Sequence, residues 1–158
     1  MQPSLKRLLE LVDDVFETRN DPTQIAFSEA DMEKMESLHS GCLQEAANAD
    51  GPISWVAVIP TSLELMNLFV QGALTERQLF EATEETTPKQ AVYLCSAIVL
   101  PEFRRSGIAF DLSVNSIRSI QEDQKIEAAF VWPFTDEGET LAQKVASSRG
   151  LPLFVRAR

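Results

Sequence analysis

The sequence predicts an α/β (α+β) protein in which helices flank a central mixed sheet. This prediction rests on residues 91–155, where short β-branched runs alternate with segments of helical periodicity. An order of strand, helix, strand, helix and strand favours neighbouring parallel strands with helices packed on their faces. The first part differs, because residues 1–52 carry mainly helical patterns. A length of 158 residues fits a single domain over residues 1–158.

Two helices are expected in the N-terminal part. Apolar residues recur at helical spacing over residues 4–18, and a Pro at position 22 follows that segment. Ser28 is a typical N-cap for a second helix, and the Asp-Gly-Pro run at 50–52 closes it. The apolar stripe of this second helix consists of Met32, Met35, Cys42, Leu43 and Ala46.

The middle of the chain contains one expected strand and two short helices. The segments are a strand over 53–59, helices over 62–71 and 76–82, and a polar loop over 81–89. The strand is short and β-branched, and Pro60 is expected to stop it. Thr61 and Thr75 are expected to cap the helices, because a Glu or Gln follows each threonine by three residues.

The second half has a regular order of elements. We expect strands over 91–100, 126–132 and 151–155, and helices over 107–123 and 137–149. Asp136 is expected to cap the last helix, and Gly150 to end it.

The composition limits the classes of function. A net charge of −10 argues against broad nucleic-acid binding. The acidic surface suits a cationic amine substrate, but solubility alone is the plainer explanation. The single histidine, His39, lies on the apolar stripe, where a structural role is commoner than catalysis. His39 and two distant cysteines, Cys42 and Cys95, lack the spacing of a metal site, so no metal is expected.

The N-terminal segment interleaves acidic and basic residues, which is not the pattern of a signal peptide. No apolar run approaches the length that spans a bilayer. We therefore expect a cytoplasmic protein that does not bind a membrane.

The most informative segment is Val-Leu-Pro-Glu-Phe-Arg-Arg-Ser-Gly-Ile-Ala over residues 99–109. A strand leads into it and a helix leaves it. The first turn of a helix carries backbone N–H groups without internal partners, and its dipole end is positive. Gly107 has no Cβ to keep an anion away from those donors, and Arg104 and Arg105 add positive charge. The segment therefore predicts a site for a phosphate group.

The spacing Arg104-x-x-Gly107-x-Ala109 after a proline-terminated strand resembles motif A of the GCN5-related N-acetyltransferases, the GNAT superfamily. The resemblance covers residues 91–155. It implies a GNAT-like sheet that splays after the motif strand, and acetyl-CoA (coenzyme A) as co-substrate with its pyrophosphate in this turn. A glycine often follows the first arginine of the family motif, whereas this chain has Arg105, which crowds the turn slightly.

The resemblance implies two sets of backbone contacts. The N–H groups of the turn would bind the pyrophosphate, and main-chain groups of the strand would pair with the pantetheine arm as an added strand does. The implied turn residues are Arg104, Arg105, Ser106, Gly107, Ile108 and Ala109, and the implied strand residues are Ala97, Ile98 and Val99.

The resemblance also implies where a catalytic residue would lie. Many family members carry a carboxylate early on the motif strand, and the matching position lies near Tyr93. Strand alternation would align Tyr93 with Cys95, Ala97 and Val99, so Tyr93 is the candidate catalytic acid, with core packing as the alternative. The family's usual tyrosine in the last long helix is replaced by Ala146. The N-terminal half also departs from the family, with one strand where a hairpin of strands normally precedes motif A.

Three functions remain open at this stage. The first is an N-acyltransferase that moves an acetyl or other acyl group from acetyl-CoA to a small amine or a protein amine. The second is a catalytically degenerate GNAT-fold module that binds acyl-CoA as a sensor or partner subunit. The third is a structural domain with an empty turn. The acceptor, the acyl length and the oligomeric state, a homodimer included, stay open.

Overall fold

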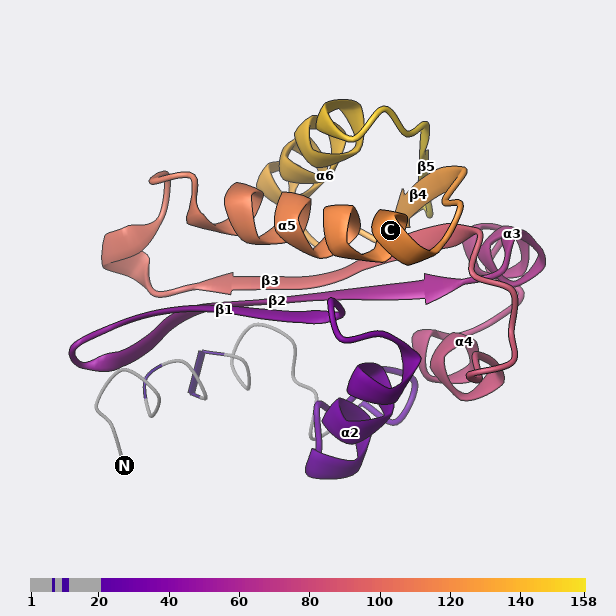
Figure 1. Cartoon of the computed structure of the whole chain (residues 1–158), viewed down its shortest axis with the longest axis horizontal. Coiled ribbons are helices and arrows are strands. Elements are labelled where there is room, and N and C mark those ends of the chain that lie inside the picture. Colours follow the sequence, from indigo (N-terminus) through magenta and orange to yellow (C-terminus); the bar gives the residue numbers. More distant parts are fainter. Residues whose placement is uncertain (1–6, 8–9, 12–20) are drawn as a thin grey trace.

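The fold is a five-stranded mixed sheet with helices on both faces (Figure 1). The structure, a computed structural model, describes residue 7, residues 10–11 and residues 21–158. The strands are β1 (Leu43–Asn48), β2 (Gly51–Thr61), β3 (Ala91–Val99), β4 (Ala128–Val131) and β5 (Leu153–Val155), and they lie in this order across the sheet. The first three strands are antiparallel, and β3, β4 and β5 are parallel. The predicted α/β class is confirmed at this level.

The helices divide between the two faces of the sheet, as Figure 1 shows for α5 and α6 on one side and α2 and α4 on the other. Their bounds are α2 (Glu29–Leu38), α3 (Leu63–Val70), α4 (Glu76–Ala82), α5 (Ile108–Asp123) and α6 (Asp136–Ser148). The core on the α2–α4 side is aromatic and includes Phe69, Tyr93 and Phe130. The core on the α5–α6 side is aliphatic. A short 3-10 turn over Pro101–Phe103 connects β3 toward α5.

The prediction of helix through Ala46 is wrong. Helix α2 has the predicted cap Ser28 but ends at Leu38, and from Leu43 the chain forms β1, which pairs with β2 across a turn at Ala49 and Asp50. His39 stabilises this change of direction. Its Nδ1 accepts from the Gly41 N–H at 2.8 Å, so its Nε2 donates to Asp123 at 2.7 Å. A hairpin of strands therefore precedes the motif strand after all, and the helical description of residues 1–52 fails from residue 43 onward.

Pro60 does not end β2, which continues to Thr61. The Val58 N–H donates to Cys42 on the β1 side, so the nitrogen of Pro60 faces that same side. Strand β1 begins only at Leu43, and the missing N–H therefore costs no ladder bond.

Two helix caps differ from the sequence prediction by one residue. Ser62, not Thr61, accepts from the first turn of α3, because the Thr61 hydroxyl is buried against Thr83 at 2.7 Å. Thr135, not Asp136, caps α6. The Thr75 cap of α4 and its reciprocal bond with Gln78 are confirmed. The helix predicted over residues 4–18 lies outside the described residues except for positions 7, 10 and 11, which are helical.

Candidate functional site

The sheet opens between its two central parallel strands. Pairing between β3 and β4 runs only from Ala91 with Ala128 to Tyr93 with Phe130. Beyond Tyr93, β3 continues for six residues paired with β2 alone among the described strands. On the other side of the opening the chain leaves β4 through Trp132 and Pro133. Because proline has no N–H to donate, it cannot extend the ladder.

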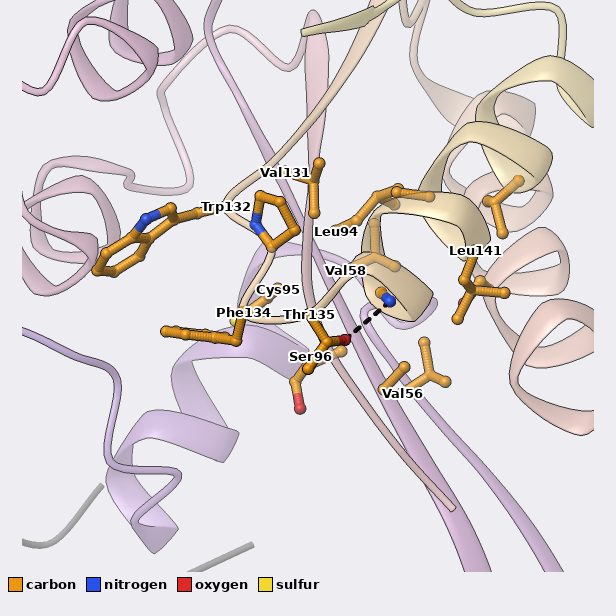
Figure 2. A pocket seen from close by; sticks show the side chains of 17 residues that line it. Val56, Val58, Leu94, Cys95, Ser96, Val131, Trp132, Phe134, Thr135 and Leu141 are labelled. Carbon is orange, nitrogen blue, oxygen red and sulfur yellow. Dashed lines mark hydrogen bonds between the residues drawn. The ribbon is translucent and has the colours of Figure 1, made fainter. Parts of the chain in front are cut away.

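A cavity of about 170 Å³ lies at this opening. Residues 56–58, 94–97, 131–135 and 138 line it together with Ser113, Leu141, Ala142 and Val145. Figure 2 shows Leu141 on one side and the rings of Trp132 and Phe134 on the other. The dashed line marks the capping bond, 3.0 Å, from the Gly138 N–H to Thr135. Cys95 is the one titratable side chain in the lining, and burial raises the pKa of its thiol well above the ordinary value.

The backbone of β3 exposes alternate residues to this opening. The Leu100 N–H donates to Ile53 and the Ile98 carbonyl accepts from Ser54, so both residues face β2. Alternation then turns the N–H and C=O groups of Ala97 and Val99 toward the side that β4 has left. Of the three strand residues that the resemblance implies, Ala97 and Val99 therefore face the open side of β3, and Ile98 belongs to the β2–β3 ladder.

A β-bulge changes which side chains share a face. The register between β2 and β3 shifts between Ala57 and Val58, so Cys95 is an extra residue opposite them. Tyr93 lies in the aromatic core, whereas Ala97 is opposite Val56 of the aliphatic core. The prediction that Tyr93 and Cys95 share a face with Ala97 and Val99 is therefore wrong.

Tyr93 is fully buried and does not line the cavity. Its hydroxyl donates to Glu76 Oε2 at 2.6 Å, and its ring stacks on Phe130 with 5.1 Å between centroids. The other oxygen of Glu76 accepts from the Ile25 N–H at 2.8 Å. Burial raises the pKa of the Glu76 carboxyl, and burial together with the nearby Glu76 charge raises the pKa of Tyr93. The Tyr93 hydroxyl therefore donates its proton to a structural hydrogen bond with Glu76.

The backbone conformation of the motif turn, residues 104–109, suits the binding of an anion. Gly107 is the N-cap of α5 with φ 86°, and a Cβ added there would meet no atom within 4 Å. Arg105 also has a positive φ, 63°, a backbone conformation that favours glycine. In the described part of the chain, no hydrogen bond uses the N–H groups of residues 105–109.

The charged side chains of the turn have different partners. Arg104 Nε donates to the Val99 carbonyl at 3.2 Å, which ties the turn to the end of β3. Arg105 is 91% exposed and lies 4.0 Å from Glu137. Glu102 accepts two hydrogen bonds from Arg7, at 2.6 and 2.7 Å, which lower the pKa of its carboxyl to about 2. Both arginines of the motif therefore remain accessible to a phosphate group.

Ala146 is 1% exposed and packs in the aliphatic core beside Val145. The position where the family usually carries a tyrosine therefore contributes no hydroxyl to the cavity.

No protein-family model matches the chain, and no curated protein or solved structure matches it either. Among the described residues, no three His, Cys, Asp or Glu side chains are placed to hold a metal ion. No helix in this part of the chain combines the length and apolar character needed to cross a membrane. The case for a function therefore rests on the motif and on the geometry of the opening.

Sequence reasoning missed three residues beside the cavity: Trp132, Phe134 and Arg156. The guanidinium of Arg156 lies over the rings of Trp132 and Phe69. The position of two of these residues in the sequence could have indicated them. Trp132 and Arg156 directly follow β4 and β5, and ligands of open α/β sheets bind outside the carboxyl ends of the strands.

We predict that Glu76→Gln increases the stability of the protein relative to the parent as the pH rises. The raised pKa means that the native protein holds the Glu76 proton more tightly than the unfolded chain. The stability that this group contributes is therefore present below its ordinary pKa of 4.5 and lost as the pH rises through the raised value. Glutamine cannot ionise; its carbonyl oxygen keeps the bond from the Ile25 N–H, and its NH2 group can donate to the Tyr93 oxygen in place of the bond that Glu76 accepts. Urea unfolding from about pH 4 to about pH 7 should show the variant gaining stability relative to the parent; a pH-independent difference would contradict the account.

Tyr93→Phe is expected to lower stability. Removing the hydroxyl leaves a buried oxygen of Glu76 without its donor, which costs about 1–3 kcal/mol. Urea unfolding measures that loss. The catalytic role of Tyr93 stays a prediction, and the same variant tests it: a fall in turnover of about tenfold or more, with CoA affinity unchanged, would assign the hydroxyl to catalysis.

Proposed function

We propose that the chain binds acyl-CoA in the opening between β3 and β4 and transfers the acyl group to an amine. The observation that carries this proposal is the divergence of the two parallel strands directly upstream of the motif turn. Strand β3 leads from the cavity at residues 94–97 to the turn at 101–107. One extended ligand can therefore place a pyrophosphate at the turn and its acyl end at the cavity.

Backbone groups supply most of the proposed binding. The free N–H groups at residues 105–109 and the positive end of α5 suit the pyrophosphate. The Ala97 carbonyl and the Val99 N–H face the open side and suit the amides of the pantetheine arm, whereas the Val99 carbonyl already accepts from Arg104. The N–H of Ala97, which lines the cavity, is placed to stabilise the oxyanion that forms when an amine attacks the thioester.

The cavity offers no general base to the proposed reaction. Its lining holds no Asp, Glu, His, Lys or Arg side chain. Only amine molecules that are already neutral would therefore attack, and the pKa of the amine sets what fraction of them is neutral. The rate of the reaction would come from orientation and from oxyanion stabilisation. We propose accordingly a modest acyltransferase with acetyl-CoA as co-substrate.

The alternative is a module that binds acyl-CoA without turning it over. The absence of a titratable group suited to proton transfer in the cavity and the buried Ala146 favour this alternative. The two functions share the CoA site and differ in one measurement, the release of free CoA thiol from acetyl-CoA across a panel of amines.

CoA is expected to stabilise the protein through the motif turn. At a CoA concentration a hundredfold above Kd, mass action contributes about 2.7 kcal/mol, which raises Tm by roughly 5–10 °C for a domain of this size. Gly107→Val should abolish the shift, because its side chain would occupy the space that the pyrophosphate needs. Thermal unfolding with and without CoA at low salt measures both effects.

Gly72→Val is the matched control. Gly72 has nearly the same backbone angle as Gly107, φ 84° against 86°, and an added Cβ would likewise meet no atom within 4 Å. Both variants therefore carry similar backbone strain, but only one alters the turn. An equal CoA shift in the parent and in Gly107→Val, or no shift in the parent at millimolar CoA, would overturn the proposed site.

A further inference from the structure

Arg156 is held in a defined position by three side-chain contacts and one backbone hydrogen bond. Its guanidinium carbon lies 4.5 Å from the centre of the Phe69 ring and 4.7 Å from that of Trp132. Its Nη1 donates to the Leu74 carbonyl at 2.6 Å, and the backbone N–H of Arg156 donates to the Val131 carbonyl in β4. The side chain is half-buried. Arginine stacked on aromatic faces loses less freedom when it then binds a ligand.

The charge of Arg156 has no protein counter-ion in the described part of the chain. No carboxylate lies within 4.0 Å of it, and no hydrogen bond uses its Nε or Nη2. This is unexpected in a protein with 24 acidic and 14 basic residues. Arg77 and Arg7, by contrast, each bind a carboxylate through two hydrogen bonds.

Arg156 stands beside the opening on the side away from α5 and α6. Trp132 packs against the aromatic core on the α2–α4 side and also lines the cavity. Because Arg156 lies over the Trp132 ring, this ring stands between Arg156 and the opening. Leu141 of α6 lies across the cavity from Trp132 (Figure 2). A thioester held along β3 with its phosphates at α5 leaves the Trp132 side open to a second substrate.

We infer that Arg156 binds the carboxylate of the acceptor, so that the acceptor is a small amino acid rather than a cationic amine. This inference rests on the proposed function, because it names the substrate class of the same site. A guanidinium offers a planar fork of donors that matches a carboxylate, and its fixed charge repels a polyamine or lysine-rich substrate. The acidic surface as a whole thus does not decide the acceptor.

The test measures ligand binding to the CoA-loaded full chain by calorimetry. The probes are glycine, β-alanine and phenylalanine, each beside its carboxamide. We expect the amino acids to bind the parent at least tenfold more tightly than the carboxamides. Arg156→Gln should weaken the amino acids by about 10- to 100-fold, the range for a lost charge-assisted contact, and leave the carboxamides unchanged.

Two further variants keep the test interpretable. Arg118→Gln makes the same charge change at an exposed position on α5 and should alter neither class of probe. Arg156→Lys keeps the charge without the fork and should give an intermediate loss, which guards against a folding defect in Arg156→Gln. CoA affinity is measured separately for every variant. No CoA binding by the parent overturns the proposed function, whereas CoA binding with equal affinity for amino acids and carboxamides overturns only the role of Arg156.

Discussion

The structure depends on one interruption in its hydrogen-bond ladder, the point where β4 stops pairing with β3 after Tyr93 and Phe130. A continuous parallel pair would satisfy the backbone of Ala97 and Val99 within the protein and leave no space between the strands. Pro133 ends β4 on one side, and the bulge at Cys95 turns β3 on the other. The cavity lies at this interruption, and residues of both strands line it.

The buried polar groups lie outside this opening and have structural partners. Glu76 opens α4, where the helix dipole favours a negative charge, and it joins Tyr93 of the sheet to Ile25 of the loop before α2. Such a connection fixes α4 against the aromatic face. The cavity keeps mainly apolar side chains and backbone groups. Any chemistry there must come from orientation and from backbone donors rather than from proton transfer by a carboxylate.

Local patterns predicted the motif strand, the turn and the following helix well, because each depends on neighbours in sequence. The strand was expected over 91–100 and ends at Val99, and Gly107, in the left-handed conformation, is the N-cap of α5. Long-range contacts decided the rest. Leu43 carries a helical pattern but pairs with Ala57, and the bulge at Cys95 leaves no mark in a single sequence. The surroundings of Arg156 come from α3, β4 and the loop before α4, so no local pattern could reveal them.

The central claim is that CoA lies along the open edge of β3 with its phosphates at the start of α5. Amide hydrogen exchange followed by NMR, with and without acetyl-CoA, tests this placement most directly. We predict strong new protection at the N–H groups of Ala97, Val99 and Gly107, whereas Ile98, already in the β2–β3 ladder, gains no more than the global stabilisation. Equal protection along β3, or binding that leaves Ala97 and Gly107 unprotected, would contradict it.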